Sequence, residues 1–311
     1  MFCRQPLIYR RCAVGLVALA LGSSPCAAAE PLKFTHQGVE RTAVLHRPEA
    51  TQAGPLPLVI ALHGLGGTGE NFRGYAQFDV TANREGFNTV YPDAVGKSWS
   101  YGRPINQPMP TVGGETVDDV GFIRLLIDDL VSRKIADPAR IYVTGISRGG
   151  LMAFTLACAL AERITAAAPL ITGMTNHQRE DCQPSRPVPI MVIAGTSDRL
   201  QSFGGAQGLH GRLLSVPETM DFWRSLHGCT RRDSHLLPHR NPDDRTQVML
   251  VEWSSCRTGI NPRLYRVEGG GHQIPSISGS NNPMSEEKFG LRNRDIETAD
   301  EVWTFFKNFP R

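Results

Sequence analysis

The chain has 311 residues, of which 41% are hydrophobic, and its 33 lysine and arginine residues nearly balance 30 aspartate and glutamate residues. This composition is typical of a globular protein with a large core, and it excludes a disordered chain or a basic nucleic-acid-binding protein. There is no internal repeat, low-complexity tract or linker-like stretch, so we predict one domain over 30–311.

The first 29 residues are predicted to be an export signal. Arg4, Arg10 and Arg11 precede an apolar run at 13–21, and small residues at 27–29 suit a cleavage site. The apolar run is too short to span a bilayer, so we expect no stable membrane anchor. Removal of three arginines and no acidic residue brings the positive and negative counts level, and nucleic acid is not an expected partner. The mature protein is predicted to be secreted or periplasmic.

Strands alternate with helices along the rest of the chain. The run 56–62 is apolar at nearly every position, as in a strand buried on both faces, whereas 117–133 has apolar residues at helical spacing. We predict an edge hairpin within 33–48, strands at 56–62, 87–91, 141–144, 166–171, 188–194, 248–253 and 263–267, and helices at 117–133, 151–162, 217–226 and 298–309. This alternation predicts an α/β fold with a mainly parallel sheet flanked by helices, and with reactive groups at the carboxyl ends of the strands.

Four cysteines follow the export signal: Cys158, Cys182, Cys229 and Cys256. An even number in an exported chain indicates disulfides. Of the three pairings that four cysteines allow, we favour Cys158–Cys182 and Cys229–Cys256, because each closes a short loop. The alternative for Cys158 is a buried free thiol in an apolar helix. No cysteine pair has zinc-site spacing and the histidines are not clustered, so no metal site is predicted.

A candidate nucleophile lies in Gly145-Ile146-Ser147-Arg148-Gly149. A predicted strand leads into this motif and a predicted helix follows it, as in the strand–turn–helix that exposes a nucleophilic serine. The turn is expected to be too tight for side chains at 145 and 149. A serine on an ordinary loop is the alternative, but the flanking strand and helix favour a nucleophile.

A serine nucleophile needs a base, and the base needs an acidic partner that fixes its tautomer. His272 follows the predicted strand 263–267 and three glycines, which leave room for the loop to bend toward Ser147. None of the other eight histidines has this setting; His63, the nearest rival, is expected to shape the glycine turn that follows it. Asp198 lies just after the predicted strand 188–194.

The chain order Ser147, Asp198, His272 is the order expected of an α/β-hydrolase. Rival acids lie in helices, hydrophilic loops or within a strand: Asp181, Asp221, Asp233, Asp243, Asp244 and Glu252. Two backbone N–H groups should stabilise the oxyanion, one from Arg148 and the other from 63–67, for which we predict Leu65. The run 63–67 has neither the dinucleotide-binding glycine pattern nor a P-loop lysine, so no nucleotide cofactor is expected.

As a set, five motifs resemble the secreted polyhydroxybutyrate depolymerase-like esterases, which are similar to feruloyl and acetylxylan esterases. In chain order, the motifs are His63-Gly-Leu, Val117-Asp-Asp-Val-Gly-Phe-Ile123, Gly145-Ile-Ser-Arg-Gly-Gly-Leu-Met152, Arg186-Pro-Val-Pro189 ahead of Gly195-Thr-Ser-Asp198, and Gly269-Gly-Gly-His272. The resemblance implies an α/β-hydrolase fold, a Ser-Asp-His triad, ester hydrolysis through an acyl-enzyme without a cofactor, and a Cys229–Cys256 bridge.

Two departures from that family bear on the substrate. Members usually have Thr-Trp-Pro after the histidine, whereas this chain has Gln273-Ile274-Pro275, which changes a wall of the pocket. Depolymerases that attack solid polyester often add a linker and a binding domain, and neither is found in this sequence. We therefore expect small or oligomeric esters as substrates. Trp99 and Tyr101 are candidates to line the pocket or to pack beneath it.

Together these features predict a serine carboxylic ester hydrolase. A serine peptidase on the same fold is an alternative, because amides use the same groups, but nothing in the sequence resembles the propeller or cap domain that such peptidases usually carry. A non-catalytic binding protein that retains the motifs is a third hypothesis, and reaction of Ser147 with a fluorophosphonate would discriminate it from an enzyme.

Overall fold

The computed structural model describes residues 29–48, 54–279 and 283–310. The predicted export signal lies outside these residues except for Ala29. A ten-stranded sheet forms the centre, with the order β1-β2-β4-β3-β7-β8-β9-β14-β13-β12. Its strands are β1 Glu30–His36, β2 Val39–His46, β3 Leu56–Leu62, β4 Asn88–Pro92, β7 Ala136–Ile146, β8 Ala166–Leu170, β9 Met191–Gly195, β12 Cys229–Leu236, β13 Gln247–Cys256 and β14 Arg263–Glu268.

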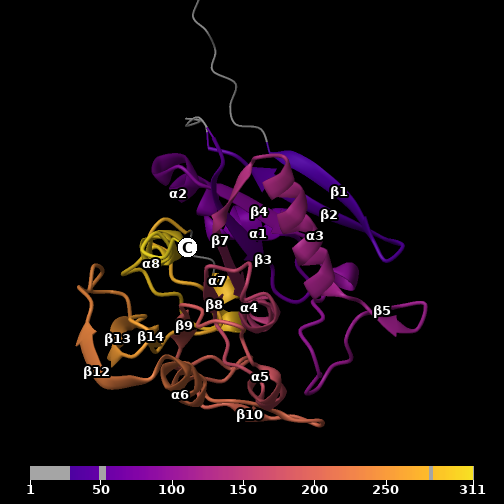
Figure 1. Ribbon diagram of the computed structural model, residues 1–311. Coiled ribbons are helices and arrows are strands. Elements are labelled where there is room, and N and C mark those ends of the chain that lie inside the picture. Colours follow the sequence, from indigo (N-terminus) through magenta and orange to yellow (C-terminus); the bar gives the residue numbers. More distant parts are fainter. Residues whose placement is uncertain (1–28, 49–53, 280–282, 311) are drawn as a thin grey trace, which may run out of the picture.

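The middle of the sheet is parallel and both edges are antiparallel. All neighbours from β4 through β3, β7, β8 and β9 to β14 pair in parallel. The hairpin β1–β2 closes one edge and β13–β12 the other, and Figure 1 shows these edges at opposite ends of the molecule. The parallel strands therefore bring their carboxyl ends, and the loops that follow, to one side of the sheet.

Helices cover both faces of the sheet. The helices are α1 Gly69–Ala76, α2 Phe78–Glu85, α3 Asp119–Ser132, α4 Arg148–Ala159, α5 Asn176–Asp181, α6 Val216–His227, α7 Pro283–Phe289 and α8 Thr298–Phe306. Residues of α3, α4 and α6 pack in one hydrophobic cluster, and those of α1, α2 and α8 pack in a second.

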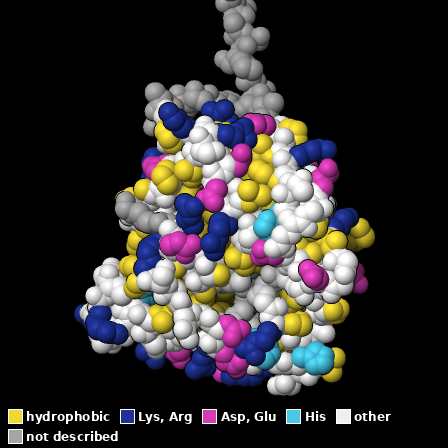
Figure 2. Space-filling view, turned by 45° about the vertical axis from the view of Figure 1, so that its right-hand side comes forward, with side chains coloured by type: hydrophobic (Ala, Val, Ile, Leu, Met, Phe, Trp, Pro, Cys, Tyr) yellow, Lys and Arg dark blue, Asp and Glu magenta, His cyan; other side chains and the backbone are white. Residues whose placement is uncertain are grey.

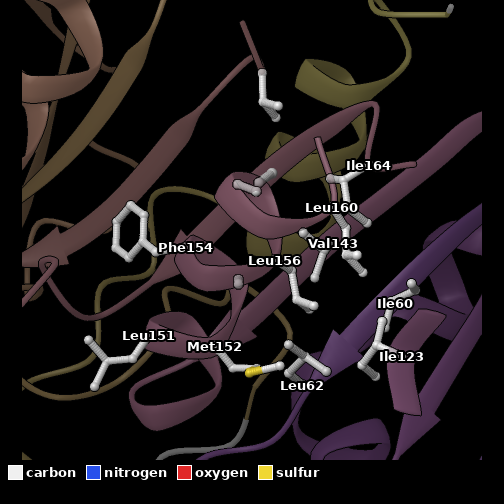
Figure 3. Packing of buried hydrophobic residues seen from close by; sticks show 14 of the residues in the cluster. Ile60, Leu62, Ile123, Val143, Leu151, Met152, Phe154, Leu156, Leu160 and Ile164 are labelled. Atoms are coloured by element: carbon white, nitrogen blue, oxygen red, sulfur yellow. The ribbon is translucent and has the colours of Figure 1, made fainter. Parts of the chain in front are cut away.

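The alternation of side chains along β3 separates these two clusters. Leu58, Ile60 and Leu62 belong to the first, while Val59 and Ala61 belong to the second, as a strand with a repeat of two residues requires. Every residue of β3 is buried. Figure 3 shows Ile60 and Leu62 of β3 facing α4 side chains such as Met152 and Leu156. The apolar side chains of β3 are therefore buried on both faces of the sheet.

Charged side chains show no dominant sign on the face of the molecule drawn in Figure 2. On the face drawn in Figure 2, basic and acidic residues are intermixed and hydrophobic residues are scattered among them. No helix of the described residues is long and apolar enough to cross a membrane. This surface agrees with the near-equal charge counts of the sequence.

The predicted strands and helices are confirmed, with differences at their ends. The expected helix 151–162 is instead α4, Arg148–Ala159, and starts directly after Ser147. The predicted start of this helix is three residues too far along the chain, because Gly149 and Gly150 are poor helix formers. Glycine stands at these two positions because neighbouring atoms leave no room for a Cβ. The predicted strand 141–144 extends to Ala136–Ile146 in β7.

Several elements were not predicted. The missed elements are α1, α2, α5, α7, β12, the 3-10 turn η1 (Val95–Lys97) and two short hairpins, β5 (Thr111–Val112) with β6 (Glu115–Thr116) and β10 (Ala206–Gln207) with β11 (Arg212–Leu213). The four missed helices have eight residues or fewer, which is too short for a clear apolar repeat. In β12, Cys229 is buried and the seven residues after it are exposed, so the strand lacks the apolar alternation of its neighbours.

Candidate active site

Ser147 occupies the turn between β7 and α4. Its backbone has φ 57° and ψ −118°, an unfavourable conformation for a residue with a side chain. A Cβ atom on Gly145 would lie 2.5 Å from the Gly149 carbonyl oxygen, and one on Gly149 would lie 2.3 Å from the Leu62 carbonyl oxygen. Both positions therefore require glycine, as predicted, and the tight turn at Ser147 has the geometry of a nucleophile elbow.

Asp198 and His272 come from the ends of two neighbouring strands. Asp198 follows β9 and His272 follows β14, and these strands pair in parallel. The His272 Nδ1 atom lies 2.7 Å from Asp198 Oδ2, and the two side chains are only 9% and 2% exposed. Because a carboxylate only accepts, it holds the proton on Nδ1 and leaves Nε2 as an acceptor.

The Asp198 carboxylate is itself fixed by backbone donors. The N–H groups of Leu200 and Gln201 donate to Oδ1 at 2.8 and 2.9 Å. The His272 N–H donates to the Phe289 carbonyl at the end of α7. These bonds hold the Asp198 carboxylate and the His272 backbone in place, so the contact between the two side chains is preorganised.

Ser147 and His272 line one cleft of about 660 Å³. The other lining residues are Gly64, Leu65, Tyr75, Tyr101, Ile105, Asn106, Gln107, Ile146, Arg148, Leu151, Leu200, Gln201, Gln273, Ser285 and Phe289. The fold thus brings the three predicted catalytic residues together. Ser147 and His272 line the same cleft, and Asp198 contacts the His272 ring from outside the lining.

Leu65 and Arg148, the predicted oxyanion donors, also line the cleft. Arg148 is the first residue of α4, so its N–H has no acceptor within the helix. The Gly66 and Gly67 N–H groups donate to Lys97 and Gly64 carbonyls, whereas the Leu65 N–H has no acceptor among the described residues. A pair of N–H groups at such positions can receive a developing oxyanion.

His63, the rival base, supports the loop from beneath. Its Nδ1 donates to the Gly64 carbonyl at 2.7 Å and its Nε2 accepts from the Ala94 N–H at 3.1 Å. Burial lowers the pKa of His63 and keeps the ring neutral. Both ring nitrogens are therefore occupied by the backbone, and His63 shapes the glycine turn as the sequence suggested.

Tyr101 and Trp99, the two aromatic candidates for the pocket lining, have different positions. Tyr101 lines the cleft, whereas Trp99 is fully buried and donates its indole N–H to the His63 carbonyl at 2.9 Å. Gln273, which stands where family members usually have the first residue of Thr-Trp-Pro, also lines the cleft and donates to the Gly290 carbonyl. Ile274 is buried in the second core cluster.

The side chain of Arg148 has contacts that the sequence does not predict, since its motif indicates a role only for the backbone N–H of this residue. Its Nη1 atom donates to Ser98 Oγ at 2.6 Å and to Gln107 Oε1 at 3.4 Å, and its guanidinium lies 5.2 Å from the centre of the Tyr101 ring. These partners belong to the segment 98–110, which has no hydrophobic repeat from which the contacts could have been predicted.

Both predicted disulfides are present. Cys158 in α4 is bonded to Cys182 at the end of α5, and Cys229 in β12 is bonded to its cross-strand partner Cys256 in β13. The alternative of a free thiol at Cys158 is therefore wrong. Within the described ranges, no group of three or more histidine, cysteine or acidic residues could hold a metal ion.

Comparisons with known proteins place the chain among esterases. A family model described as esterase PHB depolymerase matches residues 42–200, just over half of the chain, including Ser147 and Asp198. The putative esterase NocK of Nocardia uniformis subsp. tsuyamanensis is 27% identical over 283 residues, covering 86% of this chain and 79% of NocK. Feruloyl esterase B of Piromyces equi is 28% identical over 227 residues, covering 70% of this chain and only 39% of that relative's length.

A solved structure extends the comparison to the whole fold. Acetyl xylan esterase from Aspergillus awamori matches with a TM-score of 0.60 at 15% identity, covering 89% of this chain and 99% of that one. Identity this low shows the fold alone. The fold is the α/β-hydrolase fold that the motif order predicted.

Proposed function

The chain belongs to the PHB depolymerase family of esterases, and from this premise we propose that it hydrolyses carboxylic esters through an acyl-enzyme on Ser147. The observation that carries the mechanism is the 2.7 Å bond between His272 and Asp198, beside a serine held in a strained turn in the same cleft. No cofactor enters the reaction.

In the first half-reaction, Ser147 Oγ attacks the ester carbonyl while His272 Nε2 takes its proton. Asp198 holds the other ring nitrogen protonated and stabilises the imidazolium that forms. The N–H groups of Leu65 and Arg148 donate to the oxyanion of the tetrahedral intermediate. His272 then returns the proton to the departing alkoxide, so the alcohol leaves and the acyl group stays on Ser147.

In the second half-reaction, water replaces the alcohol. His272 Nε2 takes a proton from the water, whose oxygen attacks the acyl carbonyl, and the same two N–H groups receive the oxyanion. The intermediate collapses to release the acid, and His272 returns the proton to Ser147 Oγ. The cleft of about 660 Å³ is within the size range of small-molecule sites, which favours hydroxyalkanoate oligomers or aryl and acyl esters.

We also propose that the protein acts outside the cytoplasm, after cleavage at the end of segment 1–29. Two disulfides support this proposal, because such bonds persist mainly in oxidising compartments. Expression of the full chain with and without residues 1–29, followed by assay of the periplasm and medium, tests it. Activity confined to the cytoplasm with the full chain would contradict export.

The catalytic proposal is tested by a fluorophosphonate probe and an ester panel on the purified protein. We expect the probe to label Ser147, as located by peptide mass spectrometry, and to abolish hydrolysis of short p-nitrophenyl esters in proportion to labelling. Methyl ferulate, acetylated xylan and hydroxybutyrate oligomers then rank the substrates. Label on another residue, or full activity after labelling of Ser147, would sink the mechanism. If Ser147 does not react with the probe, the result favours a binding protein. If amides are cleaved faster than esters, the result favours a peptidase.

A further inference from the structure

Arg148 is a buried cation that has no acidic partner among the described residues. In the described part of the chain, two arginines are buried, Arg41 at 2% and Arg148 at 7% exposure. Arg41 donates to the carboxylate of Asp119 at 2.5 Å. Arg148 forms no ion pair with any described residue. Burial of a charge without a counter-charge is unfavourable, so this arrangement calls for a reason.

Some N–H donors of the Arg148 guanidinium have no acceptor among the described residues. Both of its hydrogen bonds, to Ser98 and Gln107, come from Nη1. The Nε and Nη2 atoms donate to no described residue, yet they are not among the buried polar atoms that are sealed from solvent. Because Arg148 lines the cleft, we take the cleft to be the space that these donors reach. The Nε–H and Nη2–H pair matches the two oxygens of a carboxylate.

The described residues that line the cleft supply no opposing charge. None of them is an aspartate or a glutamate, and their titratable groups other than Arg148 are Tyr75, Tyr101 and His272. The Asp198 carboxylate lies behind His272 and is only 2% exposed. A second cation, Arg292, is not among the lining residues but lies over the ring of Tyr75, which is, with 4.9 Å between its guanidinium and the ring centre. A bound ester therefore meets a positive potential, which an anionic substrate would neutralise.

We propose that Arg148 binds a free carboxylate carried by the ester substrate, so the preferred substrates are half-esters of dicarboxylic acids or esters of hydroxyacids with a free acid end. This proposal rests on the proposed esterase function and narrows its substrate class. The Nη1 bonds hold the side chain in place, and the free edge of the guanidinium receives the carboxylate. Arg148 would then serve the reaction twice, through its backbone N–H on the oxyanion and through its side chain on the substrate's charge.

Matched substrate pairs test the proposal on the unmodified protein. One pair is monoethyl adipate and the corresponding ethyl ester with a terminal primary amide, which differ in charge on the acyl side. The other is 3-(butyryloxy)butyrate and its primary amide, which differ on the alcohol side. We expect at least one carboxylate to have a kcat/KM about 10-fold or more above its amide, mainly through a lower KM. Equal kcat/KM values within both pairs would overturn the proposal.

Variants assign the preference to Arg148. Arg148→Met should reduce the carboxylate-to-amide ratio of kcat/KM to near 1, whereas Arg148→Lys, which keeps a point charge but loses the fork, should retain part of it. The control is Arg103→Met. It removes a positive charge from the segment 98–110, which Arg148 contacts, at a position where Arg103 forms an exposed ion pair with Asp181. It should leave the ratio unchanged. The ratio is informative even if Arg148→Met lowers activity on all esters through Ser98 and Gln107.

The outcomes separate this proposal from the esterase function. Hydrolysis of neutral esters with no carboxylate preference would overturn the role of Arg148 and leave the esterase function standing. Failure to hydrolyse any ester would overturn the esterase function. A carboxylate preference that survives Arg148→Met would also contradict the proposal, because the charge would then be recognised elsewhere.

Discussion

His227 is a fully buried histidine, remote in sequence from the three proposed catalytic residues, whose surroundings favour the neutral ring. Its Nε2 donates to the Val188 carbonyl at 3.1 Å and its Nδ1 accepts from the Thr258 hydroxyl at 3.0 Å. Burial lowers the pKa of His227 to about 4. Between that value and the ordinary histidine pKa of about 6.5, the unfolded chain binds a proton that the folded chain does not. The free energy of unfolding must therefore fall as the pH drops through this window.

We predict that His227 makes the fold acid-sensitive between pH 6.5 and pH 4. At about 1.4 kcal/mol for each pKa unit, the wild type should lose roughly 3 kcal/mol more of its unfolding free energy than His227→Gln between pH 7 and pH 4. Urea unfolding at several pH values measures the difference. His235→Gln, at an exposed position, is the control and should follow the wild type. Parallel pH profiles for the wild type and His227→Gln would contradict the prediction.

The turn between β7 and α4 connects backbone packing to the proposed nucleophile. A Cβ on Gly149 would press on the carbonyl oxygens of Leu62 and His63, at 2.3 and 2.5 Å. These are backbone atoms at the end of β3, directly before the loop that carries Leu65. A larger residue at position 149 cannot be accommodated by rotation of a neighbouring side chain, so it must displace either Ser147 or the loop that carries Leu65.

We predict that Gly149→Ala destabilises the fold by about 1–3 kcal/mol and lowers kcat/KM by about 100-fold or more, because the reacting groups move apart. Gly74→Ala is the matched control. A Cβ there meets nothing within 4 Å and the residue lies inside α1, so we expect unchanged activity and a gain of up to about 1 kcal/mol. Thermal unfolding and steady-state kinetics measure both. An active, stable Gly149→Ala would contradict the packing argument.

The same turn shows how much of the site could be predicted from the sequence. Ser147, Asp198 and His272 each follow a strand that a local sequence pattern predicts. Because these strands are parallel, the residues that follow them lie at one edge of the sheet. The start of α4 was missed because Gly149 is selected by contact with β3, which local propensity does not record. The contacts of Arg148 with Ser98 and Gln107 depend on the path of an irregular segment. No pattern in the chain encodes that path.

Two disulfides tie peripheral elements to the sheet and its helices. Cys158–Cys182 joins α4 to α5, and Cys229–Cys256 joins the exposed edge strand β12 to β13. Each closes a loop of moderate length, 24 and 27 residues apart in sequence, for which about 2–4 kcal/mol of stabilisation is expected.

We predict that reduction of both bridges lowers the Tm of the mature protein by roughly 10 °C, since about 1 kcal/mol corresponds to a few degrees for a chain of this size. Scanning calorimetry with and without a reducing agent measures the shift. A variant with serine at all four cysteines should already melt at the lower temperature and show no response to the reductant. A reductant-induced shift in that variant would mean that the bridges are not its cause.

For the molecule as a whole, the central claim is that Ser147 and His272 act as one unit in ester hydrolysis. The measurement is kcat/KM for a short p-nitrophenyl ester in Ser147→Ala, His272→Ala and the double variant. Residues that act as a unit are non-additive, so we predict that each single variant loses at least about 1,000-fold and that the double variant loses no more than a few-fold beyond the singles. Losses that multiply in the double variant, or a Ser147→Ala protein with wild-type activity, would contradict the account.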